Sequence, residues 1–285
     1  MRYHMEDISE VIMEMIKSIC SGLNDIRTKR PLVHSITNYV VMNETANAVL
    51  CLGALPIMAH AIEEMEEMAS MAGALVLNIG TLSSLWTDAM EVAGKAANRA
   101  GVPVILDPVG AGATKLRTES SRRLMDNVDV SIVRANAAEA AALAGIKAEI
   151  RGVESISAAS MNEEIARSFV EKYGCTVAIT APVDIVCDKE RLARIHNGHV
   201  MMSKVVGTGC ISNVIIASYA AIQPDLFKAA VGGLTAFGIA GEIAAAAAPE
   251  KPGTFHVELY NALYSLNEAD ISIRAKVEII DHTSG

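Results

Sequence analysis

Short runs of apolar residues alternate along the chain with segments whose apolar positions recur at helical spacing. The apolar runs predict strands at residues 32–36, 55–59, 74–80, 102–109, 130–135 and 176–180. Because polar residues rarely alternate within these runs, we expect strands buried on both faces, as in a mainly parallel sheet. The segments between them are helix-like at residues 43–53, 61–73, 84–101 and 118–127. The pattern predicts a doubly wound, three-layer α/β fold with helices on both faces of the sheet.

The last third of the chain follows a different pattern. It predicts a β-hairpin at 184–198 with a polar turn at 188–190, helical segments at 209–222, 224–248 and 254–269, and a final strand-like run at 275–280. No linker rich in proline, glycine or serine divides the sequence, and it contains no evident internal repeat. We therefore expect one domain over residues 1–285.

Composition narrows the range of partners. Hydrophobic residues make up 51% of the chain but aromatic residues only 4%, so aliphatic side chains and 14 methionines must fill the core. The formal net charge of −9 argues against a nucleic acid or an anionic membrane as partner, because such binding depends on clustered lysine and arginine. Five widely spread cysteines without a C-x-x-C pair favour a reduced, cytoplasmic protein.

Two segments resemble targeting or membrane sequences only superficially. The first 17 residues carry acidic side chains within the first ten and no unbroken apolar stretch, so they predict an amphipathic helix rather than a signal peptide. Residues 227–248 are apolar but consist mostly of alanine and glycine and include Glu242. They predict a buried helix packed closely through small residues, not a membrane span.

Ligands of open parallel sheets bind beyond the carboxyl ends of the strands. Asp107 lies at such an end, and Gly110 and Gly112 follow it in a loop that phosphate could approach. The spacing matches neither a Walker A loop nor a dinucleotide fingerprint. On these residues alone, a turn with a capping aspartate remains an alternative.

The next predicted strand leads from Arg134 into a helix start that carries Asn136 and Glu139. An amide and a carboxylate three residues apart share one helix face and could order a hydrated Mg²⁺, and Arg134 beside them suits phosphate. An ordinary capping box, with Asn136 at the N-cap and Glu139 at N3, explains the same spacing. Thr180 ends the following strand and by itself indicates only a turn.

The stretch KVVGTGCISN, residues 204–213, places Gly207, Thr208 and Gly209 before Cys210 at a predicted helix start. Glycines permit close approach to the backbone, and free N–H groups at a helix start favour an anion. Cys210 is then either a nucleophile whose thiolate the helix dipole stabilises, or a small, weakly polar residue beside a phosphate cradle. The sequence leaves both interpretations open.

Four further polar or sulfur-bearing residues lie on the first two strand–helix crossings. They are His34, Asn38, Asn43 and Met58. A lone histidine on a strand is more often a satisfied core residue than a ligand, so we expect His34 to be buried in the core.

Seven blocks occur in an order that closely resembles the hydroxyethylthiazole kinase family of the ribokinase-like superfamily. The resemblance covers roughly residues 25 to 270, and the blocks read SITNYVVMNETANAVL, MAHAIEEMEEMA, LVLNIGTL, ILDPVGAGATKLRT, NAAEAAALAG, VVGTGC and GTFHVELYNALY. The resemblance implies a ribokinase-like fold and ATP-dependent, Mg²⁺-assisted phosphorylation of the primary alcohol of 4-methyl-5-(2-hydroxyethyl)thiazole, a salvage step in thiamine biosynthesis. It also implies a homotrimer with active sites between subunits.

The resemblance also implies roles for individual residues. The thiazole-binding positions fall on Asn38, Met58 and Gly207. The acidic residues that act at the metal ion and the phosphates fall on Asp107 and Glu139. The ATP and phosphate contacts fall on Arg134, Asn136, Thr180, Thr208 and Gly209, with an anion hole on the backbone of residues 207–210.

Two blocks depart from the family pattern near the nucleotide. Alanine at 135 replaces the glycine of an arginine–glycine–asparagine run, and Thr180-Ala181-Pro182 stands where threonine–glycine is usual. Cys210 stands where ribokinase-like enzymes usually carry an aspartate. Because phosphoryl transfer has a loose transition state, a weak base can suffice. Our hypothesis is that Cys210 orients the substrate hydroxyl and accepts its proton late, while backbone amides and Mg²⁺ hold the γ-phosphoryl group.

Three other functions remain open at this point. A hydroxymethylpyrimidine kinase or another small-alcohol kinase is the nearest, although the early NYVVMNETAN block favours the thiazole. A thiol-nucleophile enzyme built on Cys210 would need a base such as His34 or His199. A non-catalytic thiazole-binding module does not explain why acidic residues suited to a metal site, Asp107 and Glu139, should be present.

Overall fold

The computed structural model describes residues 5–146 and 158–281, and a nine-stranded sheet runs through this part of the chain. Its strand order is β2-β1-β3-β4-β5-β6-β7-β8-β9. Neighbouring strands are parallel from β2 to β6 and antiparallel from β6 to β9. The strands are β1 (Leu32–Ile36), β2 (Leu55–Ile57), β3 (Ala74–Asn78), β4 (Val104–Asp107), β5 (Ile132–Asn136), β6 (Thr176–Thr180), β7 (Asp184–Cys187), β8 (Arg191–Ile195) and β9 (Val277–Asp281).

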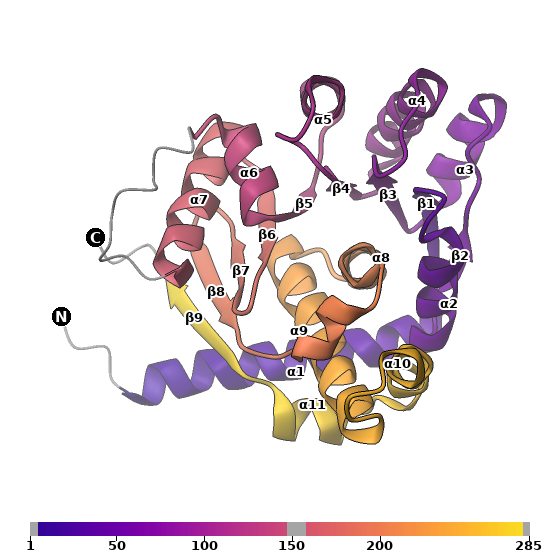
Figure 1. Cartoon of the computed structure of the whole chain (residues 1–285). Coiled ribbons are helices and arrows are strands. Elements are labelled where there is room, and N and C mark those ends of the chain that lie inside the picture. Colours follow the sequence, from indigo (N-terminus) through magenta and orange to yellow (C-terminus); the bar gives the residue numbers. More distant parts are fainter. Residues whose placement is uncertain (1–4, 147–157, 282–285) are drawn as a thin grey trace.

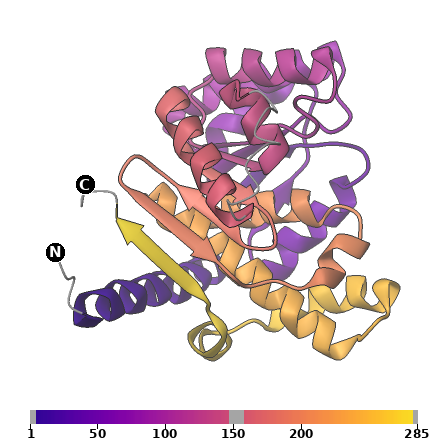
Figure 2. The same cartoon turned by 60° about the vertical axis from the view of Figure 1, so that its left-hand side comes forward.

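Helices cover both faces of this sheet, as the sequence pattern predicts (Figures 1 and 2). One layer contains α3 (Met65–Met71), α4 (Ser84–Ala100), α5 (Lys115–Asn127), α6 (Ala137–Ala144) and α7 (Ala158–Tyr173). The other contains α1 (Met5–Lys29), α2 (Met42–Leu52), α8 (Thr208–Ala220), α9 (Leu226–Ala247), α10 (Pro252–Ser265) and α11 (Glu268–Arg274). The predicted three-layer α/β class is confirmed.

Each face of the sheet has its own hydrophobic core, because successive side chains of a strand point to opposite faces. On β4, Val104 and Leu106 pack into the core beneath α3–α7, whereas Ile105 packs into the core beneath α8 and α9. A strand covered on both faces needs apolar residues at consecutive positions. This requirement explains the unbroken apolar runs in the sequence.

Several elements differ from the prediction. The predicted helix at 254–269 is wrong, since the chain breaks between α10 and α11, where Asn267 forms a capping box with Asp270 and starts a new helix. The predicted strand at 102–109 is shorter in the structure, and helix α7 was not predicted. The hairpin is confirmed: Asp188 closes its turn by accepting N–H bonds from Glu190 and Arg191.

Helix α9 is long and apolar enough to cross a membrane by length and composition, but 83% of its most apolar window is buried inside the protein. It packs against α8, α10 and α1. Its alanines and glycines allow these close contacts: a Cβ atom on Gly233 would lie 2.7 Å from the Cα of Ile216. Helix α9 is therefore a core helix, as expected for this stretch.

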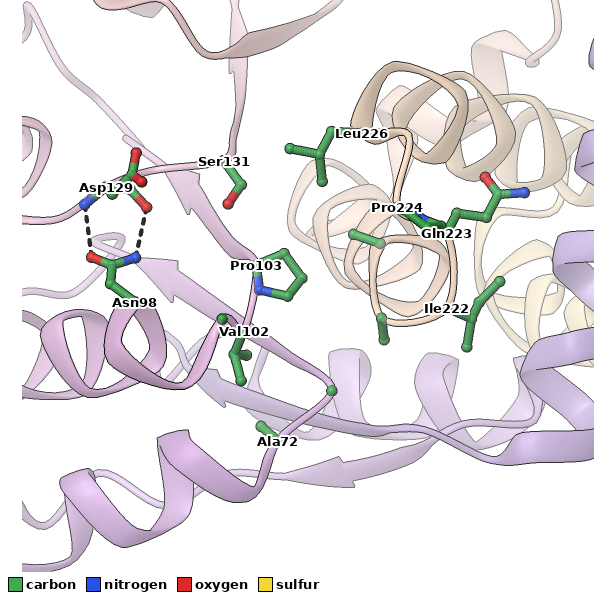
Figure 3. A pocket seen from close by; sticks show the side chains of 14 residues that line it. Ala72, Asn98, Val102, Pro103, Asp129, Ser131, Ile222, Gln223, Pro224 and Leu226 are labelled. Atoms are coloured by element: carbon green, nitrogen blue, oxygen red, sulfur yellow. Dashed lines mark hydrogen bonds between the residues drawn. The ribbon is translucent and has the colours of Figure 1, made fainter.

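An open cavity of about 550 Å³ lies at the amino ends of β3 and β4 (Figure 3). Asn98 and Asp129 close one side through two reciprocal hydrogen bonds of 2.9 and 2.8 Å. Val102 and Pro103, which precede β4, line another side. This cavity is at the opposite end of the strands from the residues with predicted chemistry.

Candidate active site

A buried cluster of amides and a carboxylate forms where β1, β3 and β4 end. Asn78 and Asp107 are register partners on β3 and β4, and the Nδ2 of Asn78 donates to the Oδ2 of Asp107 at 2.7 Å. The Oδ1 of Asn78 accepts hydrogen bonds from the Nδ2 of Asn38 at 2.8 Å and from the N–H of Gly80 at 2.9 Å. Asn78 therefore joins Asn38, which follows β1, to Asp107.

Cys210 contacts this cluster from the first turn of α8. Its Sγ lies 3.2 Å from the Nδ2 of Asn78 and 3.7 Å from the Nδ2 of Asn38. Gly207 precedes α8 as its N-cap with φ +91°, a conformation that favours glycine. Burial, and then the negative charge of Asp107, raise the pKa of the Cys210 thiol to about 11. This shift disfavours a reactive thiolate at Cys210, which is one of the two interpretations that the sequence leaves open.

A thiol-nucleophile enzyme would need a base such as His34 or His199 next to Cys210. His34 is buried in the core, as predicted, and its Nε2 lies 2.9 Å from the carbonyl oxygen of Ala59. The Nδ1 of His199 accepts a hydrogen bond from the N–H of Met201. Within residues 5–146 and 158–281, no hydrogen bond joins either ring to Cys210. The structure does not favour a thiol-nucleophile enzyme.

Arg134 connects Asp107 to the glycine loop of residues 207–210. Its Nη1 lies 3.6 Å from the Oδ1 of Asp107, and its Nη2 donates to the Oγ1 of Thr180. A Cβ atom on Gly209 would lie only 2.7 Å from Nη2, so the loop rests directly on the guanidinium group. Asp107 is fully buried (0% exposed), and burial raises its pKa to about 6 although Arg134 opposes this shift.

Glu139 is fixed in a capping box at the start of α6, which is one of the two interpretations of the spacing between Asn136 and Glu139. Its Oε2 accepts the N–H of Asn136, whose Oδ1 accepts the N–H of Glu139, both at 2.9 Å. Its Oε1 accepts the N–H of Gly110 at 2.8 Å, in the loop after Asp107. The charge of Glu139 also contributes to the raised pKa of Asp107, so the two carboxyl groups are electrostatic neighbours.

These two carboxyl groups are suited to a hydrated cation. The Oδ1 of Asp107 is buried and accepts no hydrogen bond from the described part of the chain, and Arg134 is its ion-pair partner at 3.6 Å. Among the described residues, no group of three or more histidine, cysteine, aspartate or glutamate side chains converges to hold a metal. Such a site fits Mg²⁺, which keeps several waters and needs one or two protein carboxylates.

A cavity of about 510 Å³ opens beside Arg134. Four of the residues predicted to contact ATP line it: Arg134, Thr180, Thr208 and Gly209. The other lining residues lie within segments 181–184 and 197–203 and on helices α8 and α9. Asn136 is not among the lining residues. Four predicted nucleotide contacts thus share one cavity next to the polar cluster.

Met58 does not join the polar cluster through any described hydrogen bond. It follows β2, the edge strand, and β1 separates β2 from β3. The Nδ1 of His60 lies 3.3 Å from the carbonyl oxygen of Met58. Within one chain, Met58 is therefore an edge residue.

Two residues of this site, Asn78 and Asp184, are not among those predicted from the sequence. Asn78 ends a buried strand two residues before Gly80, as Asp107 ends a buried strand shortly before Gly110. Asp184 lines the 510 Å³ cavity, and its Oδ1 accepts the N–H of Ala181 at 2.8 Å. This bond holds the turn after Thr180 where the sequence departs from the family pattern. Burial raises the pKa of Asp184 to about 7.

Comparison with known proteins agrees with this geometry. The family model of the hydroxyethylthiazole kinase family matches residues 23–269. A hydroxyethylthiazole kinase of Thermoanaerobacter pseudethanolicus is 50% identical over 257 residues, which cover 90% of this chain and 97% of the relative.

Solved structures give the same result. The structure of a hydroxyethylthiazole kinase from Pyrococcus horikoshii OT3 superposes with a TM-score of 0.85 at 43% identity, covering 93% of this chain and 99% of that one. A ribokinase-like superfamily protein from Enterococcus faecalis V583 has a TM-score of 0.57 at 13% identity, over 83% of this chain and 87% of that one, and shares the fold. The family and fold predicted from the sequence are both confirmed. The chain belongs to the hydroxyethylthiazole kinase family.

Proposed function

We propose that this protein transfers the γ-phosphoryl group of ATP to the primary alcohol of 4-methyl-5-(2-hydroxyethyl)thiazole; its membership of the hydroxyethylthiazole kinase family supports this reaction. The observation that carries this proposal is the meeting of three features at one end of the sheet. They are the glycine loop of residues 207–210, the ion pair between Arg134 and Asp107, and a cavity of about 510 Å³. A volume of this size is typical of small-molecule and cofactor sites.

Positioning and charge neutralisation supply most of the catalysis of phosphoryl transfer. The N–H groups at the start of α8 and the Arg134 guanidinium face the position we assign to the migrating phosphoryl group. Asp107 and Glu139 would hold Mg²⁺ through its waters, and the ion would neutralise phosphate charge there. Asn136 keeps Glu139 oriented through the capping box.

The chemistry of Cys210 limits its role. With its pKa raised to about 11, the thiol is protonated at neutral pH. We therefore keep the orienting role for Cys210 and give up the proton-accepting one. In a loose transition state the hydroxyl proton leaves late, and it can pass to the transferred phosphoryl group itself.

We place the thiazole against Asn38, Gly207 and Cys210, on the side of the cluster away from the nucleotide cavity. The edge position of Met58 supports a role for it in the site of a neighbouring subunit, in a homotrimer. Tyr39 and Val40 are exposed apolar residues directly after Asn38, which also suits a surface covered by a second copy. We further propose one catalytic domain over residues 1–285 that acts in the cytoplasm.

The test is ADP formation by the purified protein with ATP and Mg²⁺, with and without the thiazole alcohol. We expect ADP release to depend on the alcohol, a phosphate monoester by ³¹P NMR, and loss of activity in EDTA that added Mg²⁺ restores. Hydroxymethylpyrimidine serves as the competing alcohol. Faster turnover of the pyrimidine would contradict the substrate assignment, and alcohol-independent ADP release would contradict the transfer itself.

A further inference from the structure

Glu242 is an isolated charge on an apolar helix. Apart from Lys228 near the start, it is the only charged residue of α9. Its side chain is only 16% exposed. Placing a carboxylate largely out of water costs free energy unless hydrogen bonds compensate, so its partners are informative.

Within the described part of the chain, every hydrogen bond to Glu242 is accepted by the same carboxylate oxygen. The Oε1 atom accepts from the Nδ2 of Asn197 at 3.1 Å, from the N–H of Gly198 at 3.2 Å and from the Nζ of Lys276 at 3.0 Å. Asn197 and Gly198 lie just after β8, where the chain enters the wall of the 510 Å³ cavity. The carboxylate therefore holds the beginning of that wall.

Asn197 is committed to this anchoring role. Its Oδ1 accepts the N–H of Lys276 at 2.8 Å, and its Nδ2 also donates to the carbonyl oxygen of Arg274 at 2.8 Å. A Cβ atom on Gly238 would lie 2.8 Å from the carbonyl carbon of Asn197, so this backbone lies directly on α9. The side chain of Asn197 thus binds protein groups, although the residue lines the cavity.

The same wall is held at its other end by the glycine loop. A 3₁₀-helix over Val200–Lys204 follows the anchored residues. The Oγ1 of Thr208, the first residue of α8, donates to the carbonyl oxygen of Met202 at 2.9 Å. Residues 197–203 are therefore fixed between α9 and the loop to which we assign the phosphates.

We propose that Glu242 is a positioning residue for the nucleotide: it fixes the wall of residues 197–203 and so sets the affinity for ATP rather than the rate of phosphoryl transfer. This inference rests on the proposed function, which places the nucleotide in the 510 Å³ cavity. Glu242 acts through Asn197 and Gly198 and does not line the cavity itself.

The test compares Glu242→Ala, Glu242→Gln and the control Lys276→Met, which removes the ion pair but leaves the bonds from Glu242 to Asn197 and Gly198. Kd for a non-hydrolysable ATP analogue with Mg²⁺ is measured by calorimetry, and kcat and KM by ADP formation. We expect Glu242→Ala to raise Kd and the KM for ATP about tenfold, with kcat within about twofold of wild type. Glu242→Gln keeps an acceptor but loses the charge and should raise Kd about threefold. Lys276→Met should stay within about twofold.

Wild-type nucleotide affinity in a folded Glu242→Ala protein would overturn the inference, as would a fall in kcat at unchanged KM. If Glu242→Ala does not fold, the near-isosteric variant Glu242→Gln provides the test. Wild-type affinity of Glu242→Gln for the ATP analogue would then overturn the inference. Failure of the wild-type protein to bind the analogue would instead overturn the proposed function, so the two failures are distinguishable.

Discussion

Asn78 donates a hydrogen bond of 2.7 Å to Asp107 across the neighbouring strands β3 and β4. The orientation of the Asn78 amide is determined by its surroundings, because its Oδ1 accepts two N–H groups. Its Nδ2 must then face Asp107 and Cys210. One amide thereby fixes the carboxylate that we place beside the phosphates and the thiol that we place beside the alcohol.

Replacement of Asn78 should reduce turnover more than nucleotide binding. Asn78→Ala removes the donor to Asp107, and Asn78→Asp places a second carboxyl group against it. We expect kcat to fall on the order of 10- to 100-fold, with the larger loss in Asn78→Asp and the KM for ATP little changed. Steady-state ADP formation measures this.

The control for Asn78 is Asn98→Ala, which breaks the pair with Asp129 at the opposite end of the strands. Its kcat should remain close to wild type. A wild-type kcat in Asn78→Asp would contradict the importance of this hydrogen bond.

Cys210→Ala should retain a substantial fraction of turnover, since we assign the thiol an orienting role and not a covalent or basic one. Cys210→Asp should also stay active, because aspartate is the usual residue here in the superfamily that the sequence resembles. Circular dichroism and thermal unfolding establish that both variants are folded before kinetics are compared. Complete loss of activity in folded Cys210→Ala would mean that the thiol is essential.

Gly209→Ala should impair phosphoryl transfer by displacing Arg134. The added Cβ would lie 2.7 Å from Nη2, and Arg134 must then leave its position between Asp107 and Thr180. Because small misplacements of catalytic groups are costly, we expect a loss of kcat on the order of 100-fold.

Gly253→Ala is the matched control for Gly209→Ala, since nothing lies within 4 Å of its added Cβ atom. Alanine in this helical position should leave kcat unchanged and stability equal or slightly higher. Equal activities of the two glycine variants would rule out the proposed contact between the loop and Arg134.

Asp184 should make stability depend on pH near neutrality. Burial raises its pKa from 3.8 to about 7, so the folded state binds the proton more tightly than the unfolded chain. The free energy of unfolding should therefore fall as the pH rises from about 4 to about 7 and stay low above that range. Urea unfolding at pH 5 and pH 8 measures this change.

Asp184→Asn keeps an oxygen that can accept the N–H of Ala181 but cannot ionise. The difference in unfolding free energy between pH 5 and pH 8 should therefore be smaller in Asp184→Asn than in wild type. The same pH dependence in both proteins would show that Asp184 does not titrate in this range.

The sequence predicts the part of this molecule that depends on local pattern. Buried apolar runs mark the strands, and the residues that end them, such as Asp107 and Thr180, lie at one edge because parallel strands share a direction. Register is a non-local property, so nothing near Asn78 in the sequence indicates that it bonds Asp107. The partners of Glu242 likewise lie about 35 to 45 residues away along the chain.

The structure is also needed to decide whether Glu139 caps a helix or is placed to bind a metal ion. Asn136 and Glu139 form the capping box that their spacing permits. What the spacing cannot show is that the other oxygen of Glu139 reaches Gly110, in the loop that follows Asp107. The sequence does not predict the helix break before Asn267 for a related reason, since the cap residue lies within a segment that otherwise has helical spacing.

The most direct test is a crystal structure of the protein with a non-hydrolysable ATP analogue, Mg²⁺ and the thiazole alcohol. We predict the terminal phosphate at the backbone amides of residues 207–210, next to Arg134, with the rest of the nucleotide in the cavity walled by residues 197–203. The alcohol oxygen should lie between Cys210 and that phosphate. A triphosphate bound elsewhere, with the glycine loop free of phosphate, would contradict the mechanism proposed here.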